Sequence, residues 1–163
     1  MTNHEFPMSN IKNIATLSRI IKAAKAKKKK IVFTNGCFDI LHVGHVEYLS
    51  RAKKMGDVLI IGLNSDSSVK KLKGVGRPVN KERDRAKVLS ALYFVDYVTI
   101  FNEETPERLI KKIAPDVLVK GGDWDAANIA GSGFVRSHGG KVRIVPFVKG
   151  FSTTSLIKRM LGD

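Results

Sequence analysis

The sequence predicts an α/β fold, in which helices cover both faces of a doubly wound, parallel sheet of five strands. Short apolar runs alternate along the chain with segments whose apolar residues recur at helical spacing. Residues 58–63 are continuously apolar, which is typical of a strand buried on both faces of a parallel sheet. No internal repeat or low-complexity linker divides the chain. We therefore expect a single domain over residues 1–163, with a covering helix around residues 10–24 and a core at residues 31–163.

The composition limits the classes of protein that the chain can belong to. A hydrophobic content of 43% is enough for a packed core, and the single cysteine cannot form an internal disulfide. Without a signal peptide or a long apolar run, the chain is expected to be cytoplasmic, with no membrane insertion. The net charge of +14 predicts attraction to anions such as nucleotides, sugar phosphates, nucleic acid or acidic lipid. The lysine-rich residues 25–30 lack interleaved aromatic side chains, which favours a solvated surface over a nucleic-acid patch.

The first elements follow from apolar periodicity and helix caps. Ser9 is expected to cap a helix over residues 11–24, and the apolar run at residues 31–34 predicts the first strand. A helix is predicted at residues 43–55, because its apolar positions fall on one stripe. Gly56 and Asp57 then stop the chain before the buried strand at residues 58–63.

The middle of the chain combines caps, a loop and a further strand. The polar residues 64–66 end the second strand and are expected to cap a helix at residues 67–72. Residues 73–78 hold two glycines, two cations and a proline, which indicates a mobile loop able to fold over a phosphorylated ligand, or else an ordinary surface connection. Asn80 is expected to cap a helix that ends at Leu92, with Arg83, Arg85 and Lys87 spread around it. Residues 97–101 predict the third strand.

The last third of the chain repeats the same alternation. Thr105 is expected to cap a helix that stops before Pro115, and residues 116–120 predict the fourth strand. Residues 121–124, Gly-Gly-Asp-Trp, then form either a corner that approaches a ligand or a plain turn. A short helix is expected within residues 126–138, followed by a fifth strand at 142–145. The final helix is predicted at residues 156–161.

Two histidines mark a candidate anion site after the first strand. Asn35 and Gly36 allow a sharp turn off this strand, and His42 and His45 then fall at the N-terminal end of the next helix. Free N–H groups and the positive end of the helix dipole favour an anion there. A metal-binding or capping pair of histidines is the alternative. Cys37 is expected to be a small buried filler, because its neighbours are apolar.

The motif Gly36-Cys37-Phe38-Asp39, followed by His42-Val43-Gly44-His45, resembles the signature of the HxGH nucleotidyltransferase superfamily. This superfamily transfers a nucleoside monophosphate from a nucleoside triphosphate. The hydroxyl run at residues 152–155 resembles its second signature, at the start of the last helix, although hydroxyls there are also ordinary caps. The resemblance implies a Rossmann-like sheet of order 3-2-1-4-5. In that order the corners after the first and fourth strands converge on one pocket.

A narrower resemblance concerns the intervening segments. Residues 73–80, 95–98 and 116–123 are similar to the adenylyltransferase half of the bacterial proteins that make ADP-heptose for lipopolysaccharide. That half is often fused to a sugar kinase, for which this chain has no room, so it would be the free-standing form. Residues 147–150 depart from the related glycerol-3-phosphate cytidylyltransferases, whereas Trp124 resembles their corner. The choice between ATP and CTP therefore stays open.

The resemblance implies a role for each candidate residue. AMP would pass from ATP to a sugar 1-phosphate, expected to be heptose 1-phosphate, by direct in-line attack. The implied catalytic residues are His42, His45 and Lys73. The implied nucleotide-binding residues are Thr34, Asn35, Gly36, Cys37, Phe38, Asp39, Gly44, Gly121, Asp123, Ser152, Thr153, Thr154 and Ser155. The implied acceptor-binding residues are Asn64, Asp66, Arg77 and Lys120.

The expected partners are ATP and a sugar phosphate, without nucleic acid, and a homo-oligomer is left open. Mg²⁺ is expected to arrive with ATP, because no carboxylate cluster indicates a protein metal site and Asp39 is the one plausible acidic contact. Three alternatives remain at this stage. The first is a cytidylyltransferase acting on glycerol 3-phosphate or a similar phosphate. The second is a module that binds nucleic acid or another acidic surface, and the third is a nucleotide sensor without turnover.

Overall fold

The five strands form a single parallel sheet in the order β3-β2-β1-β4-β5. The structure is a computed structural model that describes residues 10–122, 125–126, 128–146, 150 and 152–162. The strands are β1 (Ile31–Gly36), β2 (Val58–Asn64), β3 (Tyr97–Phe101), β4 (Val117–Gly121) and β5 (Lys141–Val145). The predicted fold class and strand order are both confirmed.

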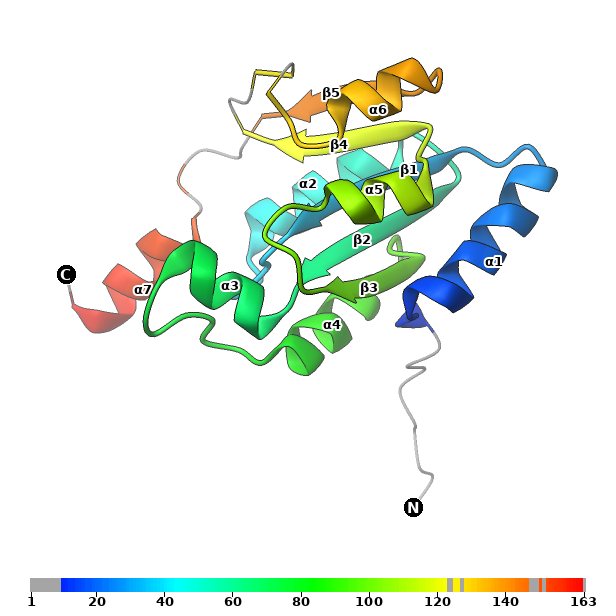
Figure 1. The fold of residues 1–163 in the computed structure, drawn as a ribbon. Coiled ribbons are helices and arrows are strands. Elements are labelled where there is room, and N and C mark those ends of the chain that lie inside the picture. The colour runs from blue at the N-terminus through cyan, green and yellow to red at the C-terminus, as the bar shows by residue number, and fades with distance from the viewer. Residues whose placement is uncertain (1–9, 123–124, 127, 147–149, 151, 163) are drawn as a thin grey trace.

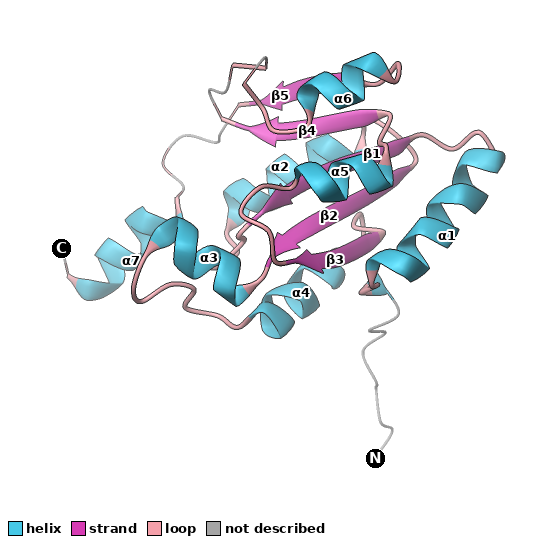
Figure 2. Ribbon diagram, in the orientation of Figure 1, coloured by secondary structure: helices cyan, strands magenta, loops and turns pink. Residues whose placement is uncertain are grey.

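Seven helices are present in the described part of the chain. They are α1 (Ile14–Ala26), α2 (Val43–Lys53), α3 (Asp66–Lys73), α4 (Glu82–Ser90), α5 (Glu107–Ile113), α6 (Ser132–Ser137) and α7 (Thr153–Leu161). Helices α2 and α4 cover one face of the sheet, whereas α1, α5 and α6 cover the other (Figure 1). Helices α3 and α7 lie beyond the carboxyl ends of the strands (Figure 2). Those ends therefore meet at an edge that neither layer of helices covers.

The core has one apolar cluster on each face of the sheet. Strand β1 serves both, since Val32 belongs to the cluster that contains residues of α2 and α4, whereas Phe33 belongs to the cluster that contains residues of α1 and α5. Every residue of β2 is buried, as its continuous apolar run predicts. Leu49 of α2 and Leu109 of α5 are among the helix residues that fill the two faces. Burial of these apolar surfaces is the main force that holds the helices against the sheet.

Three predicted helix starts are wrong, and at the first two of them tertiary contacts engage the residues concerned. Helix α1 begins at Ile14 under an Asn13 cap, and Ile11 instead bridges Val98 of β3; the expected cap, Ser9, lies outside the described residues. Helix α4 is preceded by Lys81 rather than Asn80. The Asn80 side-chain amide donates instead to the main-chain oxygen of Asp39, at 2.7 Å. Helix α5 is preceded by Pro106 rather than Thr105.

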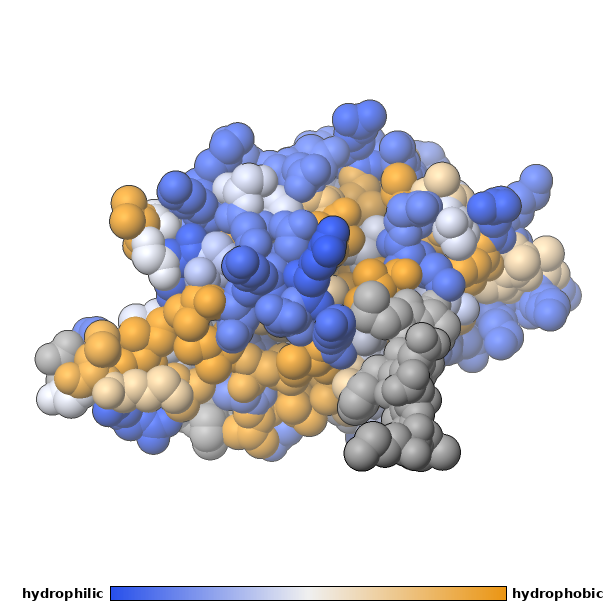
Figure 3. Space-filling view, turned by 90° about the horizontal axis from the view of Figure 1, so that it is seen from below, coloured by the Kyte–Doolittle hydropathy of each residue, from blue (hydrophilic) through white to orange (hydrophobic). Residues whose placement is uncertain are grey.

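The predicted final helix starts earlier than expected. Helix α7 begins at Thr153, and Ser152 caps it through a reciprocal pair of hydrogen bonds with Ser155. No described residue of α7 is buried, and Met160 and Leu161 are each 73% exposed. Figure 3 shows the apolar surface that gathers at this end of the molecule. Among the described residues, no helix is both long enough and apolar enough to span a membrane.

Candidate active site

A cavity of about 980 Å³ opens at the carboxyl edge of the sheet. It brings together both predicted corners, the loop after α3 and the start of α7. The predicted site residues that line it are Asn35, Gly36, Cys37, Phe38, Asp39, His42, Gly44, His45, Asn64, Lys73, Arg77, Lys120, Gly121, Ser152, Thr153, Thr154 and Ser155. Segments far apart in the sequence therefore meet around one volume, which is large enough for a nucleotide and a second small ligand.

The cavity lies where β1 and β4 separate. These strands pair only at Val32 with Val117 and at Phe33 with Leu118, although both continue further toward the cavity. The Tyr48 hydroxyl of α2 bridges the widening gap, since it bonds to the Thr34 hydroxyl and donates to the main-chain oxygen of Val119 at 3.2 Å. Burial raises the pKa of Tyr48, so its phenol stays protonated.

Thr34 is itself fully buried and does not line the cavity. Its hydroxyl is engaged by Tyr48, so in this structure Thr34 is not placed to contact a phosphate in the cavity. Tyr48 takes its place on the cavity wall, where the sequence did not predict it. One signal was present: Tyr48 follows His45 by three residues on α2, which puts the two side chains on the same face.

The rings of His42 and His45 stack at the start of α2. Their centroids lie 3.9 Å apart with 25° between the ring planes, and the edge of Phe38 meets His45 at 5.2 Å. His42 occupies the N-cap position, yet its side chain makes no capping hydrogen bond, so the capping alternative is wrong. The Nδ1 atom of His45 is buried and finds no hydrogen-bond partner among the described residues. Such an atom is available to a ligand that enters the cavity.

Burial keeps both histidines uncharged at neutral pH. Desolvation lowers the pKa of His42, and desolvation followed by repulsion from His42 lowers the pKa of His45 to about 4. Both rings point toward a cavity where the helix dipole of α2 already favours anions. A neutral imidazole there offers one N–H donor, and it takes up a proton more readily once an anion is bound.

The backbone of the corner is shaped for close packing. Phe38 has a φ of 42°, an unusual conformation for a side chain of this size, and its ring lies under Gly36. A Cβ atom at Gly36 would lie 3.0 Å from the Phe38 ring. A larger residue at position 36 would therefore have to displace the Phe38 ring by a few tenths of an ångström.

Lys73 ends α3 and stands at the mouth of the cavity. It is exposed, and its amine forms no ion pair or hydrogen bond with the described residues. Gly74 and Gly76 follow with φ of 88° and 82°, and nothing lies within 4 Å of where their Cβ atoms would be. This open stretch gives Lys73 freedom to approach a ligand, as the predicted loop requires.

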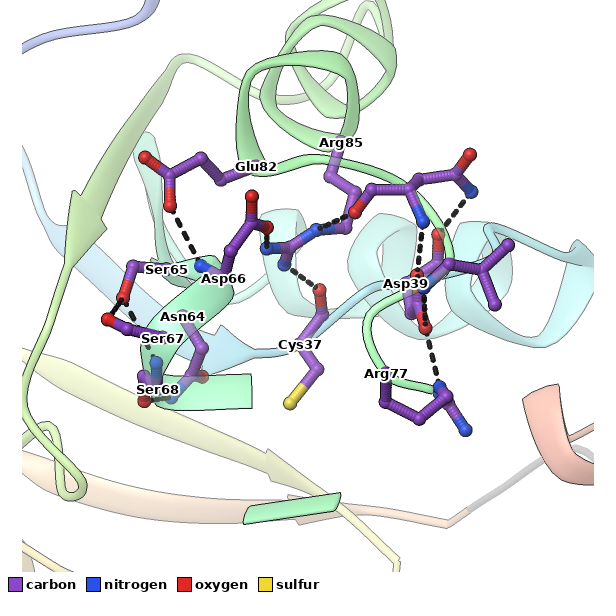
Figure 4. A network of polar contacts seen from close by, with 12 residues as sticks. Cys37, Asp39, Asn64, Ser65, Asp66, Ser67, Ser68, Arg77, Glu82 and Arg85 are labelled. Carbon is purple, nitrogen blue, oxygen red and sulfur yellow. Dashed lines mark hydrogen bonds and ion pairs between the residues drawn. The ribbon is translucent and has the colours of Figure 1, made fainter. Parts of the chain in front are cut away.

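Arg77 and Asp39 are paired across the cavity wall. The Arg77 Nε donates to Asp39 Oδ2 at 2.6 Å, and the same carboxylate accepts the backbone N–H groups of Val79 and Asn80 (Figure 4). Burial alone would raise the pKa of Asp39, but these hydrogen bonds hold it below its ordinary value. Asp39 is thus an anchor for residues 77–80, which weakens the prediction that it contacts a metal ion.

Lys120 reaches into the cavity from the end of β4. Its Nζ donates to Asn35 Oδ1 at 2.6 Å, so the two corners touch directly. Burial lowers the pKa of Lys120 to about 8, partly offset by its interaction with Cys37. Burial likewise raises the pKa of the Cys37 thiol, although Cys37 is only half-buried and lines the cavity, unlike the buried filler that was expected. Lys120 therefore carries a charge that anion binding would stabilise further.

The hydroxyl run divides into two pairs. Ser152 and Ser155 cap α7 and bond to each other, whereas the hydroxyls of Thr153 and Thr154 have no hydrogen-bond partner among the described residues. All four residues line the cavity. Thr153 and Thr154 are therefore the side chains of this run that remain available to a phosphate.

Two other predicted residues lie outside the cavity or outside the described chain. Asp66 does not line it; its carboxylate accepts instead from the buried Arg85 at 2.8 Å, so in this structure Asp66 is not placed to contact an acceptor in the cavity. Asp123 and Trp124 lie outside the described residues. Sequence reasoning missed several lining residues from two further loops, namely Glu104, Thr105, Pro106, Asn128, Ile129 and Ala130. No local sequence pattern identifies them as site residues, because it is the order of the strands in the sheet that places their loops beside the cavity.

The described residues provide no cluster of three or more His, Cys, Asp or Glu side chains that could hold a metal ion. Of those that line the cavity, Asp39 and Glu104 carry carboxylates, and Asp39 is already held by Arg77 and two backbone N–H groups. A divalent ion in this cavity would therefore depend on oxygen ligands brought by the substrate.

Comparisons with known proteins agree with this geometry. A family model described as cytidylyltransferase-like matches residues 33–157. The bifunctional protein HldE of Geobacter metallireducens is 55% identical over 158 residues, which are 97% of this chain and 32% of the relative. HldE of Campylobacter concisus is 57% identical over 150 residues, 92% of this chain and 30% of that protein. This chain thus spans about a third of the length of the curated relatives it matches.

Among solved structures, the lipopolysaccharide core biosynthesis protein from Thermoplasma volcanium is 30% identical, with a TM-score of 0.62. The match covers 76% of this chain and 99% of that one. The family model spans the sequence from β1 to α7, which includes both signatures that meet in the cavity. The chain therefore belongs to the cytidylyltransferase-like family of HxGH nucleotidyltransferases.

Proposed function

We propose that this nucleotidyltransferase moves AMP from ATP to a sugar 1-phosphate, heptose 1-phosphate being the expected acceptor, and releases pyrophosphate. The observation that carries the proposal is the single cavity that unites the histidine corner, the loop of Lys73, Lys120 and the hydroxyl run. The cavity combines an anion-binding end with a mouth that carries further cations. One nucleoside triphosphate and one phosphorylated acceptor match that arrangement.

The triphosphate would bind across the starts of α2 and α7. Both helix N-termini face the cavity and present backbone N–H groups and a positive dipole end to an anion. His42 and His45 would donate hydrogen bonds to the phosphate oxygens. Thr153 and Thr154 would add their hydroxyls at the far end of the triphosphate, and the backbone around Phe38 would hold its middle.

The transfer itself needs no covalent enzyme intermediate. An oxygen of the acceptor phosphate, already anionic, would attack the α-phosphorus and form the new O–P bond, while the bond to pyrophosphate breaks in line. Catalysis is then positioning and neutralisation of the charge that builds on the phosphate oxygens. Lys73, which directly precedes the open stretch at Gly74 and Gly76, would close onto these oxygens as the charge develops.

Mg²⁺ would be held by the oxygens of the triphosphate, where it supplies further neutralisation of charge. The protein would bind this complex. Lys73, Lys120 and the histidines would then offset the negative charge of the triphosphate that Mg²⁺ does not neutralise. Such transfer from ATP is expected to take place in the cytoplasm.

The acceptor end would combine cations with neutral polar groups. Arg77 and Lys120 would hold the acceptor phosphate, and a guanidinium can do so bidentately. Glu104 lines the same cavity, pairs with Lys71 at 3.6 Å, and would repel a phosphate. Unlike the carboxylate of Asp39, which Arg77 pairs, that of Glu104 is better suited to sugar hydroxyls, which favours a sugar phosphate over glycerol 3-phosphate.

The test is a screen for pyrophosphate release. ATP and CTP would each be crossed with heptose 1-phosphate, glycerol 3-phosphate, phosphoethanolamine and phosphopantetheine, and specificity constants measured. We expect ATP with heptose 1-phosphate to be the best pair. If CTP with glycerol 3-phosphate is better, the chain is a cytidylyltransferase of the alternative kind and the heptose assignment fails.

Two further outcomes would replace the proposal altogether. ATP binding without turnover of any pair would indicate a nucleotide sensor. Steeply salt-dependent binding to generic duplex DNA or RNA, again without turnover, would indicate a module that binds nucleic acid through its net charge.

A further inference from the structure

Arg85 is a buried cation in the wall behind the cavity. Its side chain is 1% exposed, and it donates to three acceptors: Cys37 O at 2.5 Å, Asn80 O at 2.9 Å and Asp66 Oδ1 at 2.8 Å (Figure 4). Arg85 lies on α4 beside the core residues Ala86 and Leu89. It does not line the large cavity, so it is not placed to touch a ligand there.

A buried guanidinium is a costly choice at such a position. Removing a charge from water costs several kcal/mol unless hydrogen bonds and a counter-charge compensate. Here each acceptor lies in a different direction, and only a planar fork with five donors can reach all three at once. An apolar side chain would pack on α4 as well but would join nothing. The arrangement therefore indicates a role in holding segments together.

The three segments joined by Arg85 all frame Lys73. Cys37 belongs to the corner that precedes the histidines, and Asn80 ends the loop that follows Lys73. Asp66 begins α3, the helix that Lys73 ends. The backbone N–H of Asp66 is also fixed from α4, because it donates to Glu82 Oε2 at 2.8 Å. The chain segments before and after Lys73 are thus both held by residues of α4. The corner that precedes the histidines is held by one of these residues, Arg85.

Asp39 fixes the end of the loop from the opposite side. Its carboxylate accepts the backbone N–H groups of Val79 and Asn80, each at 2.9 Å, while Arg85 takes the backbone oxygen of Asn80. Between these anchors, the loop at Gly74 and Gly76 has open space around it. The loop is therefore free in its middle and fixed at both ends, and the fixed ends share one guanidinium.

We propose that Arg85 is a positioning residue, which sets where Lys73 can reach relative to His42 and His45. The proposal rests on the proposed function, because it concerns the same transfer reaction. Arg85 would act through the backbone of the corner and the ends of the loop. Its loss would leave the ligand-binding groups in place but misalign Lys73 at the moment of transfer.

The first test is Arg85→Lys, which keeps the charge but loses the fork. We expect kcat to fall by about 10- to 100-fold, as a misplacement of about 1 Å produces, with the KM for ATP changed much less. Arg83→Lys is the matched control, since Arg83 is an exposed cation on the same helix and should leave both constants unchanged. Asp66→Asn removes the charge of one acceptor outside the cavity, and it should lower kcat in the same direction but less.

A double-variant cycle separates positioning from a merely structural role. If Arg85 acts by placing Lys73, Arg85→Lys should lower kcat little further once Lys73 is already alanine. Independent effects that multiply would overturn the proposal, as would an Arg85→Lys enzyme with unchanged kcat. Asp66→Asn gives the same cycle if Arg85→Lys does not fold.

Hydrogen exchange supplies a readout that does not need turnover. In Arg85→Lys, the amides of residues 74–80 should exchange about tenfold faster, whereas those of β2 stay as in the parent protein. Unchanged exchange in this segment would overturn the proposal. If the parent protein transfers no nucleotide at all, the proposed function fails, and the exchange result alone then decides whether Arg85 holds the loop.

Discussion

The imidazole rings of His42 and His45 stack with their centroids 3.9 Å apart, at the start of the helix whose dipole faces the cavity. Two charged rings at this distance would repel each other, and burial penalises the charge of each. The pair is therefore stable as neutral rings in the empty enzyme. Protonation of either ring becomes favourable only when an anion enters, which links the charge of the site to its occupancy.

The stability of the protein should consequently depend on pH. The pKa of His45 is lowered from 6.5 to about 4, so below pH 6.5 the unfolded chain binds a proton that the folded chain excludes. The free energy of unfolding should fall as the pH drops from about 6.5 toward 4. Urea titrations of the parent protein and of His45→Gln measure this, and the variant should show the shallower profile. Identical profiles would contradict the lowered pKa.

His45→Ala should reduce kcat by about two powers of ten or more and leave the fold intact, because one positioned donor to the transition state is lost. His138→Ala is the control, since His138 stands at the end of α6 and does not line the cavity. Pyrophosphate release measures both. Activity of His45→Ala near that of the parent would remove His45 from the mechanism.

Lys73→Ala should lower kcat more than it weakens ATP binding. Lys73 has no partner among the described residues, so it is expected to engage fully only when both substrates are present. Binding is measured by calorimetry and kcat by turnover, with the exposed Lys70→Ala on the same helix as control. Equal losses in binding and rate would instead mark Lys73 as a ground-state contact.

Glu104→Gln should raise the KM for a sugar 1-phosphate by about tenfold, while the KM for glycerol 3-phosphate changes little. A charged acceptor of hydroxyl hydrogen bonds is replaced by a neutral one, and hydrogen bonds to charged groups are the stronger. Glu103→Gln is the neighbouring control, because Glu103 does not line the cavity. If both acceptors are affected alike, Glu104 does not read the sugar.

Gly62→Ala in β2 should destabilise the protein by about 1–3 kcal/mol, because the added methyl group would overpack the buried core. A Cβ at this position would lie 2.8 Å from Phe33 Cζ and 3.0 Å from Leu109 Cδ2. Gly133→Ala in α6, where nothing lies within 4 Å, should be neutral or slightly stabilising. Urea denaturation of the two variants gives the comparison, and equal stabilities would refute the predicted clash.

The sequence was informative wherever burial alone determines the pattern. Strand β2 is buried on both faces and therefore apolar along its length, and α2 shows one apolar stripe because one face meets the sheet. Which strands are neighbours is not a local property. The order of the sheet, and with it the meeting of the Asn35 and Lys120 corners, came from the family resemblance rather than from periodicity.

The misses in the site have a common physical cause. Asn80 is a good helix cap in isolation, but Asp39 and Arg85 compete for its polar groups. Arg85 itself was expected only as one of the cations spread around its helix. Its spacing of four residues from the buried Leu89 puts it on the core face of α4, a signal that hydrophobic periodicity overlooks because the residue is charged.

The separation of β1 from β4 gives the substrate a structural part to play. Strands β1 and β2 pair at six positions, whereas β1 and β4 pair at two, and the cavity occupies the seam beyond them. A ligand that bonds to both corners cross-links the two halves of the sheet, and ligation of the folded state alone raises its stability. We therefore expect the lifetime of the enzyme in a cell to increase with the concentration of its substrates. Molecules without bound substrate should open first along this seam and be degraded by proteases sooner.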